Sequence, residues 1–172
     1  MLITPDFFQR DVLEIAPELP GKLLMRKFSN GEQKAYRITE VEAYRGEEDM
    51  ACHASKGKTP RTSVMYEPGG VWYVYLIYGM HWMLNVVTAE KNNPQAVLIR
   101  GIETWNGPGK LTKALEINKT FNGRPLAKAT GLWIASDNQS PDGKAILQAP
   151  RIGIDYAGDY WKNKPWRYYL SL

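Results

Sequence analysis

A glutamate, a tyrosine and a histidine close together in the sequence carry side chains that could do chemistry. Glu42 and Tyr44 end the segment RITEVEAY (residues 37–44), whose alternating apolar and polar residues predict a β-strand, and His53 follows nine residues later. Because successive side chains of a strand point to opposite faces, Glu42 and Tyr44 should project from the same face. A carboxylate held beside an aromatic ring could bind a planar, polar ligand and activate water next to it.

Other residue types and motifs in the sequence exclude several alternative chemistries for this carboxylate. Cys52, His53 and His81 are too few and wrongly spaced for a zinc site, so we expect no metal and no cofactor. The GxSxG motif and the GxGxxG dinucleotide fingerprint are both absent. What remains is a carboxylate, many aromatic rings and an internal arginine, Arg100. This set fits hydrolysis at a sugar carbon with a planar leaving group: the carboxylate deprotonates water while aromatic faces hold the base.

Glu42 needs a rigid support, and the residues before it predict one. Residues 21–28 and 34–43 are expected to be strands, and Ser29–Glu32 between them carries the Asn-Gly signal of a hairpin turn. Glu42 would then lie at the far end of a strand whose register is fixed by pairing.

A second hairpin is predicted over residues 71–87, from the apolar runs VWYVYLI and HWMLNVV around a YGM tip. Tyr78 and Met80 are large and apolar where a turn usually carries Asn, Asp or Ser. From the residues alone, two explanations are open: the tip folds under another element, or it is a wedge that enters between stacked bases. Asn85 is an amide inside an otherwise apolar strand.

Three basic side chains lie in sequence contexts that suit anion binding. Arg61 ends the polar loop KGKTPR, which is either a solvated loop or a source of phosphate contacts. Arg100 lies inside the predicted strand 96–104, an uncommon place unless the arginine is paired or binds an anion. Lys110 belongs to the turn GPGK, which opens a predicted helix at residues 111–117 and exposes N–H groups suited to phosphate. The GxxxxGK[ST] spacing is absent, so a nucleotide triphosphate site is not supported.

The remaining predicted elements are short. They are helical turns from Asp6 and over residues 11–15, strands over residues 132–136, 146–149 and 151–154, and a turn-rich segment at residues 137–143. Short helices mixed with hairpin-forming strands predict an α+β (mixed α/β) fold with a largely antiparallel sheet. We expect a single domain over residues 1–172, since 172 residues suffice for one core.

Composition and charge limit the partners. No apolar run approaches the roughly 20 residues of a membrane span, and Asp6 and Asp11 interrupt the layout of a signal peptide. The single cysteine cannot form an internal disulfide, so a cytoplasmic location is expected. Residues 1–49 carry seven Lys/Arg against ten Asp/Glu, whereas residues 50–172 carry fifteen against eight. This basic C-terminal part, with a pI of about 9.1, favours a polyanionic partner.

Several short motifs together resemble the alkyladenine (3-methyladenine) DNA glycosylase family. They are EVEAY (Glu40–Tyr44), His53, YVYLIYGM (Tyr73–Met80) with Asn85, LIRG (Leu98–Gly101), GPGKL (Gly107–Leu111) with INK (Ile117–Lys119), and RIGIDYAG (Arg151–Gly158). They occur in the family's order over most of the chain. The resemblance implies one α/β domain with a curved antiparallel sheet and a protruding hairpin that enters the DNA minor groove.

The resemblance also implies a role for each matching residue. Glu42 is the expected general base, with Arg100 near the target phosphate and the attacking water. The other expected roles are base-binding pocket for Tyr44, His53, Tyr75 and Asn85, DNA intercalation for Tyr78 and Met80, and phosphate binding for Lys110, Arg151 and Gly158. Arg61 of the basic loop is a further expected phosphate-binding residue, on the evidence of its loop alone. Asn85 would disfavour the exocyclic amine of normal guanine. The implied activity is excision of alkylated purines, with hypoxanthine as a further candidate, from damaged double-stranded DNA by a monomer, associated with the nucleoid if the source is prokaryotic.

Two other functions are considered. A non-catalytic binder could use the same basic and aromatic surface on nucleic acid. A transferase acting on RNA or nucleotides is disfavoured because the sequence has no recognisable cofactor loop.

Overall fold

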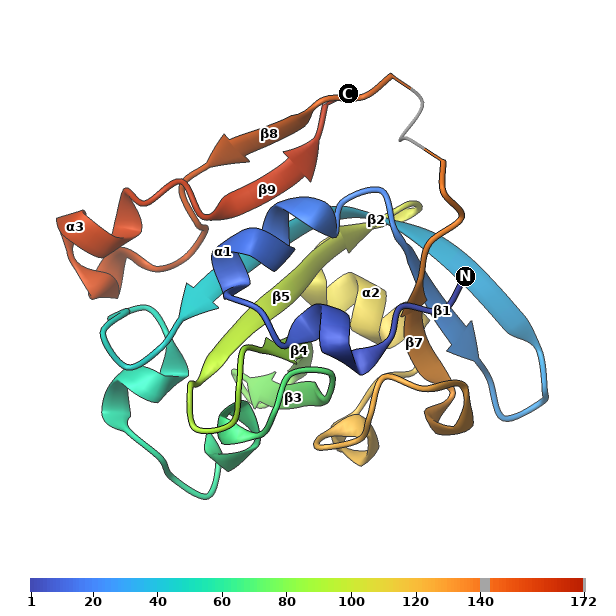
Figure 1. The fold of residues 1–172 in the computed structure, drawn as a ribbon, viewed down its shortest axis with the longest axis horizontal. Helices are drawn as coiled ribbons and strands as arrows, with labels where there is room; N and C mark the ends of the chain where they lie inside the picture. Colours follow the sequence, from blue (N-terminus) through green and yellow to red (C-terminus); the bar gives the residue numbers. More distant parts are fainter. Residues whose placement is uncertain (140–142, 172) are drawn as a thin grey trace.

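The computed structural model describes residues 1–139 and 143–171, whose strands form a nine-stranded open sheet (Figure 1). Its main path runs β3-β4-β5-β2-β1-β7, with β6 on β5, β9 on β2 and β8 on β9. All these pairings are antiparallel. The strands are β1 (Leu23–Lys27), β2 (Gln33–Arg45), β3 (Trp72–Ile77), β4 (His81–Thr88), β5 (Gln95–Ile102), β6 (Trp105–Asn106), β7 (Leu132–Ala135), β8 (Ile146–Ala149) and β9 (Arg167–Leu170). The expected mixed fold with a largely antiparallel sheet is confirmed.

Strand β2 is the centre of this sheet. Its first half pairs with β1 and its second half, from Ile38 to Arg45, pairs with β5. Residues 40–42 also pair with β9 on the other edge. The part of β2 that carries Glu42 is therefore held by neighbours on both sides, which limits its movement.

The helices are short and pack on the sheet. They are α1 (Val12–Ile15), α2 (Pro108–Ala114) and α3 (Asp159–Lys162), with 3-10 turns η1 (Pro5–Phe8), η2 (Ala16–Glu18), η3 (His53–Lys56), η4 (Ser63–Tyr66), η5 (Lys119–Phe121), η6 (Lys128–Thr130) and η7 (Asp155–Ala157). In Figure 1, α1 crosses β2 and β5. Asp11 begins α1 by accepting a hydrogen bond from the Leu13 N–H, as an N-cap residue does. Buried apolar side chains of α1, α2 and the central strands form the main core.

The strand pairing is irregular where β5 passes β2. The consecutive residues Glu40 and Val41 pair with Gly101 and Ile99, so Arg100 is an extra residue in β5. Such a β-bulge changes the direction in which a side chain points. Here it is Arg100 whose direction is set by the bulge.

The C-terminal region differs from the sequence prediction. Residues 151–154 are not a strand, because Arg151 turns inward to an acidic partner and Ile154 is buried in a separate small cluster. The strand that pairs with β8 is β9, whose aromatic and basic sequence did not reveal it. Of the expected turn-rich segment 137–143, residues 140–142 lie outside the described residues. Helix α2 begins at Pro108, so Lys110 belongs to its first turn.

Candidate active site

The Glu42 carboxylate is fully buried in β2, and each of its oxygens accepts a hydrogen bond. The Tyr44 hydroxyl donates to Oε1 at 2.8 Å, and the Ile152 backbone N–H donates to Oε2 at 2.6 Å. Arg100 Nη1 lies 3.6 Å from Oε1. Three donors therefore converge on a side chain that is 0% exposed.

Burial dominates the ionisation of Glu42. It raises the pKa of the carboxyl above its usual 4.5, and the charge of Glu40 adds to the rise. Arg100 and the hydrogen bonds from Ile152 and Tyr44 lower the pKa but do not cancel the effect of burial. A carboxylate with a raised pKa is a stronger base than one on the surface, so this environment suits proton abstraction from water.

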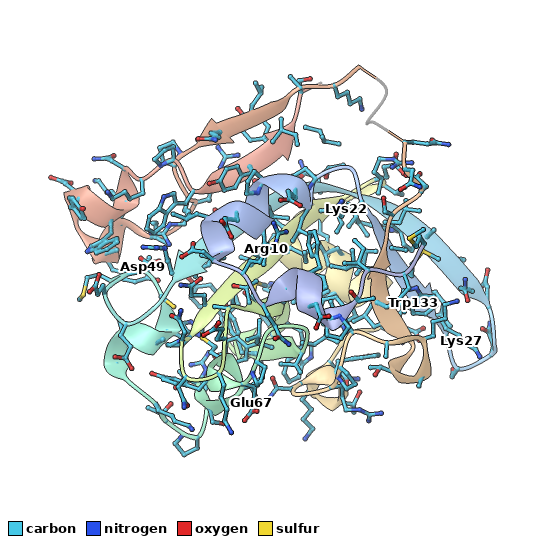
Figure 2. All side chains as sticks on the ribbon, viewed as in Figure 1. Arg10, Lys22, Lys27, Asp49, Glu67 and Trp133 are labelled. Carbon is cyan, nitrogen blue, oxygen red and sulfur yellow. The ribbon has the colours of Figure 1, made fainter. Side chains whose placement is uncertain are left out.

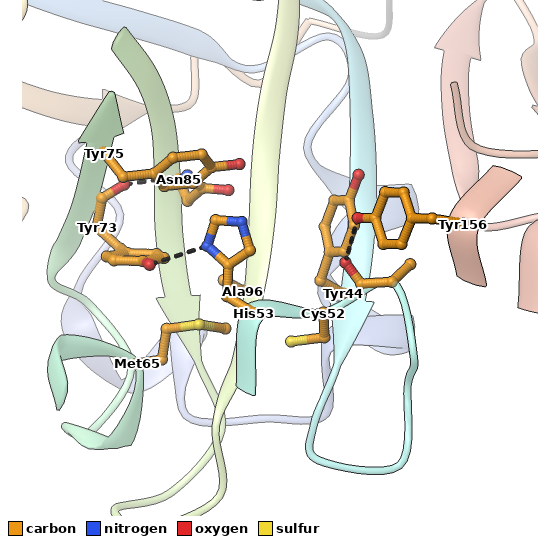
Figure 3. A pocket seen from close by; sticks show the side chains of 10 residues that line it. Tyr44, Cys52, His53, Met65, Tyr73, Tyr75, Asn85, Ala96 and Tyr156 are labelled. Atoms are coloured by element: carbon orange, nitrogen blue, oxygen red, sulfur yellow. Dashed lines mark hydrogen bonds between the residues drawn. The ribbon is translucent and has the colours of Figure 1, made fainter. Parts of the chain in front are cut away.

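A pocket lined by aromatic rings lies beside Tyr44 (Figure 3). Tyr44 and Tyr156 stand on one side of it, and His53 and Tyr75 stand on the other. The His53 and Tyr75 rings are in contact, with centroids 4.4 Å apart. The cavity between the rings has a volume of about 50 Å³ and shares its walls with an outer cleft of about 480 Å³. Two ring-lined walls that face each other could hold a flat heterocycle by stacking.

His53 begins η3, and its ring is fixed by a tyrosine. His53 Nδ1 lies 3.0 Å from the Tyr73 hydroxyl. Burial, followed by the charges of Arg61 and Lys56, lowers the pKa of His53 to about 4. The imidazole is therefore neutral near pH 7, which leaves hydrogen bonding, not protonation, as its role toward a ligand.

Asn85 lines the same pocket from β4. Its Nδ2 donates to the backbone carbonyl of Tyr73 at 3.1 Å, and its side chain is buried. The hydrogen bond fixes the orientation of the amide. Together with Tyr44, His53 and Tyr75, all four residues expected to bind a base lie around one cavity.

The tip of the β3–β4 hairpin is exposed. Tyr78 is 90% exposed and Met80 is 68% exposed, so the tip does not fold under another element. Tyr78 has φ 50 and Gly79 has φ 65, and the Met80 N–H closes the turn on the Ile77 carbonyl. A positive φ is unusual for a bulky side chain, and such strain is typical of functional positions.

The expected phosphate-binding residues lie in different settings. Arg61 and Lys110 are exposed, and the Arg61 guanidinium lies over the Tyr75 ring, 5.3 Å from its centroid. Arg61, Tyr78 and Arg100 line the outer cleft together. Gly158 is exposed in the turn between η7 and α3, with φ 84.

The expectation that Arg151 binds phosphate does not fit its position. Its Nη1 and Nη2 lie 2.6 Å and 2.9 Å from the two carboxylate oxygens of Asp49, and both side chains are 0% exposed. Figure 2 shows Asp49 in the loop after β2, on the side of the C-terminal segment. Because its guanidinium is enclosed by protein, the Arg151 side chain is not accessible to a phosphate.

Three residues near the site were not assigned a role from the sequence. Tyr73 contacts His53, Tyr156 lines the pocket and donates a hydrogen bond to the Ala51 carbonyl, and Glu40 contacts Arg100. Tyr73 stands two residues before Tyr75, so strand alternation alone could have placed it on the pocket face. Tyr156 lies in a loop region, for which alternation gives no signal.

In residues 1–139 and 143–171, three or more His, Cys, Asp or Glu side chains nowhere come together as a group that could hold a metal ion. Over the same ranges, none of the helices combines the length and the apolar character needed to cross a membrane.

Comparison with known proteins places the chain in a family. The profile of "Methylpurine-DNA glycosylase (MPG)" matches residues 6–106 and 103–172. A relative from Borrelia garinii subsp. bavariensis is 48% identical, covering 96% of this chain and 94% of the relative. A relative from Natranaerobius thermophilus is 42% identical over 99% and 96%, and one from Psychrobacter cryohalolentis is 43% identical over 92% and 87%. All three carry 3-methyladenine DNA glycosylase as a provisional name. The chain therefore belongs to the methylpurine-DNA glycosylase family.

Proposed function

We propose that the protein is a monofunctional DNA glycosylase that excises alkylated purines, such as 3-methyladenine and 7-methylguanine, from double-stranded DNA and leaves an abasic site. The observation that carries this proposal is the buried Glu42 carboxylate of raised pKa, next to a pocket walled by aromatic rings. Membership of the methylpurine-DNA glycosylase family and the names of the relatives support DNA repair as the setting.

Glu42 acts as the general base in this scheme. A water oxygen attacks deoxyribose C1′, the bond from C1′ to the purine nitrogen breaks with its electron pair going to the base, and Glu42 takes the proton of the water. General base catalysis contributes about 10²–10⁴-fold in rate. Because Glu42 is covered in this structure, Tyr44 or Arg100 must shift when DNA binds so that water reaches the carboxylate.

The ring-lined pocket would hold the extruded purine. Tyr44 on one side and His53 with Tyr75 on the other provide faces for stacking, at roughly 1–3 kcal/mol per base. An alkylated purine is cationic, so tyrosine faces add a cation–π attraction of about 0.5–2 kcal/mol. Asn85 would reject the exocyclic amine of normal guanine, and we expect Asn85→Ser to raise release of unmodified guanine.

The DNA contacts follow from the exposed surface. Tyr78 and Met80 at the hairpin tip would enter the minor groove and fill the space that the extruded base leaves. Arg61 and Lys110, both exposed, would contact phosphates, and Gly158 could bring a backbone N–H to another. A monomer would suffice, because the base pocket and the hairpin tip are both formed by one chain.

Glu42→Gln tests the proposed base. Single-turnover release of free base from a duplex with one 3-methyladenine should fall by about 10²–10⁴-fold while affinity for the damaged duplex is retained. Glu48→Gln, at an exposed carboxylate in the following loop, is the matched control and should not change the rate. Activity near wild type in Glu42→Gln would exclude Glu42 as the base. Absence of base release by the wild-type protein would favour a non-catalytic DNA-binding protein.

Two further measurements define the reaction. Borohydride should trap no covalent protein–DNA adduct, because water, not a lysine amine, attacks C1′; a clear adduct would exclude a monofunctional enzyme. Free base released from duplexes with different single lesions ranks the substrates. Hypoxanthine is neutral and a poorer leaving group, and a neutral His53 can assist it only by a hydrogen bond, so it should be released more slowly than 3-methyladenine.

A further inference from the structure

Glu40 has no part in the reaction as described so far, yet its carboxylate joins two arginines next to Glu42. Glu40 Oε1 accepts hydrogen bonds from Arg100 Nε at 3.3 Å and from Arg167 Nη1 at 3.2 Å. The Glu40 and Arg100 side chains are only 15% and 16% exposed. Glu40 thus connects β2 with β5 and β9 at the level of the proposed base.

Arg100 has little else to fix its direction. Its Nη1 lies 3.6 Å from Glu42 Oε1, which is longer than a hydrogen bond. A long, flexible side chain is not held by one such contact, because ordering it costs conformational entropy. The bond from Nε to Glu40 is the shorter of the two contacts, and it sets the plane of the guanidinium.

The backbone around Arg100 also directs its side chain toward Glu40 and Glu42. The bulge that makes Arg100 an extra residue of β5 brings its side chain to the face of Glu40 and Glu42. Gly101 makes this bulge possible, since a Cβ at that position would lie 2.8 Å from Thr39 Oγ1. Backbone and carboxylate together place one arginine between two glutamates.

We propose that Glu40 is a positioning residue for base excision: it holds Arg100 by Nε, so that Nη1 faces Glu42 and the reacting sugar without closing into a tight ion pair with Glu42. This role rests on the proposed function, because it requires Glu42 to be the base. A tight Arg100–Glu42 ion pair would weaken Glu42 as a base, since Arg100 already lowers the pKa of that carboxyl. Glu40 shares the positive charge and keeps the two apart.

A double-mutant cycle separates this role from a merely structural one. Glu40→Ala should lower single-turnover base release by about 10-fold to 100-fold when Arg100 is present, because a displaced catalytic contact has an effect of about this size. In an Arg100→Ala background the same substitution should have little further effect, since Glu40 acts through Arg100. Glu40→Gln keeps the shape of the side chain but loses the charge that holds the guanidinium, so it should lower the rate in the same direction by a smaller factor, and it serves if Glu40→Ala does not fold.

The pH profile gives an independent readout. Glu40→Gln removes a negative charge that raises the pKa of Glu42, so the acid limb of the rate profile should move to lower pH. Glu103→Gln is the matched control: Glu103, the residue after β5, lies 3.8 Å from Arg37 of β2, and its side chain is 59% exposed. It should leave both the rate and the profile unchanged.

The outcomes distinguish the two proposals. Equal losses with and without Arg100, or wild-type activity in both Glu40 variants, would overturn the positioning role while a strong Glu42→Gln defect upheld the proposed base. Wild-type activity in Glu42→Gln would instead overturn the base assignment on which the role of Glu40 rests.

Discussion

Two arginine–carboxylate contacts near the site are built in opposite ways. Arg151 and Asp49 form a closed, bidentate pair at 2.6 Å and 2.9 Å with no exposed surface. Arg100 lies between Glu40 at 3.3 Å and Glu42 at 3.6 Å, partly open to the cleft. The closed pair has one arrangement, whereas the open contact leaves donors of Arg100 free for substrate.

The Arg151–Asp49 pair also fixes the backbone next to Glu42, which Arg100 contacts. Asp49 also accepts from the N–H groups of Arg45 and Ala51, and Arg151 donates to the Ala43 carbonyl. The residue after Arg151 is Ile152, whose N–H binds Glu42. The closed pair therefore fixes the backbone that binds the proposed base, whereas Arg100 keeps fewer hydrogen bonds at the place where we propose that the reaction occurs.

Asp49→Asn should have the largest effect on stability. It leaves the buried Arg151 charge without a counter-charge, and breaking such a pair destabilises by about 3–5 kcal/mol. Urea unfolding followed by circular dichroism would measure the loss. Glu18→Gln, which breaks an exposed pair with Arg10, is the control and should cost less than about 1 kcal/mol. Equal losses in the two variants would mean that enclosing the Arg151–Asp49 pair does not make its loss more costly than that of an exposed pair.

Arg100→Gln should act on ionisation more than on folding. Arg100 lowers the pKa of Glu42, so its removal raises that pKa further above 4.5 and moves the acid limb of base release to higher pH. The rate falls as pH decreases through this limb, because Glu42 must be ionised to act as a base. Single-turnover rates measured across pH should show the acid limb displaced to higher pH in Arg100→Gln relative to wild type. This direction is opposite to that expected for Glu40→Gln, and a shift to lower pH would contradict the proposed geometry.

Glu42→Gln should barely change stability although it abolishes the proposed base. Burial of the ionised carboxylate is unfavourable, as its raised pKa reflects, so losing the charge offsets losing the attraction of Arg100. We expect a change in the free energy of unfolding within about 1 kcal/mol of wild type. Urea unfolding beside Asp49→Asn makes the comparison direct. A loss as large as that of Asp49→Asn would identify Glu42 as a structural carboxylate.

Local sequence patterns predicted those features that depend on residues close together in the sequence, namely the two hairpins. The Asn-Gly turn and strand alternation gave the hairpin that holds Glu42, and the apolar runs around Tyr78 gave the second hairpin. Contacts between distant residues were not predictable in this way. The RIGIDYAG motif assigns Arg151 to phosphate binding by resemblance, but its partner Asp49 lies 102 residues away in the sequence. The register shift at Arg100 likewise depends on strand β2, so the contact with Glu40 emerged only from the structure.

The exposed hairpin tip is, like Arg100, a part of the proposed site that the surrounding protein does not enclose. Tyr78 has φ 50 and packs against little, so Tyr78→Asn should raise the free energy of unfolding by about 0.5 kcal/mol, because asparagine tolerates this conformation. The same change removes the wedge, so base release should fall more from an intact duplex than from one with the lesion in an unpaired bulge, where extrusion is easier. Tyr160→Asn, at an exposed tyrosine of α3, is the control for the rates and should not change base release from either duplex. Lower stability in Tyr78→Asn would mean that the tyrosine is held at the tip by packing. An equal fall in rate on both duplexes would mean that it does not act as a wedge.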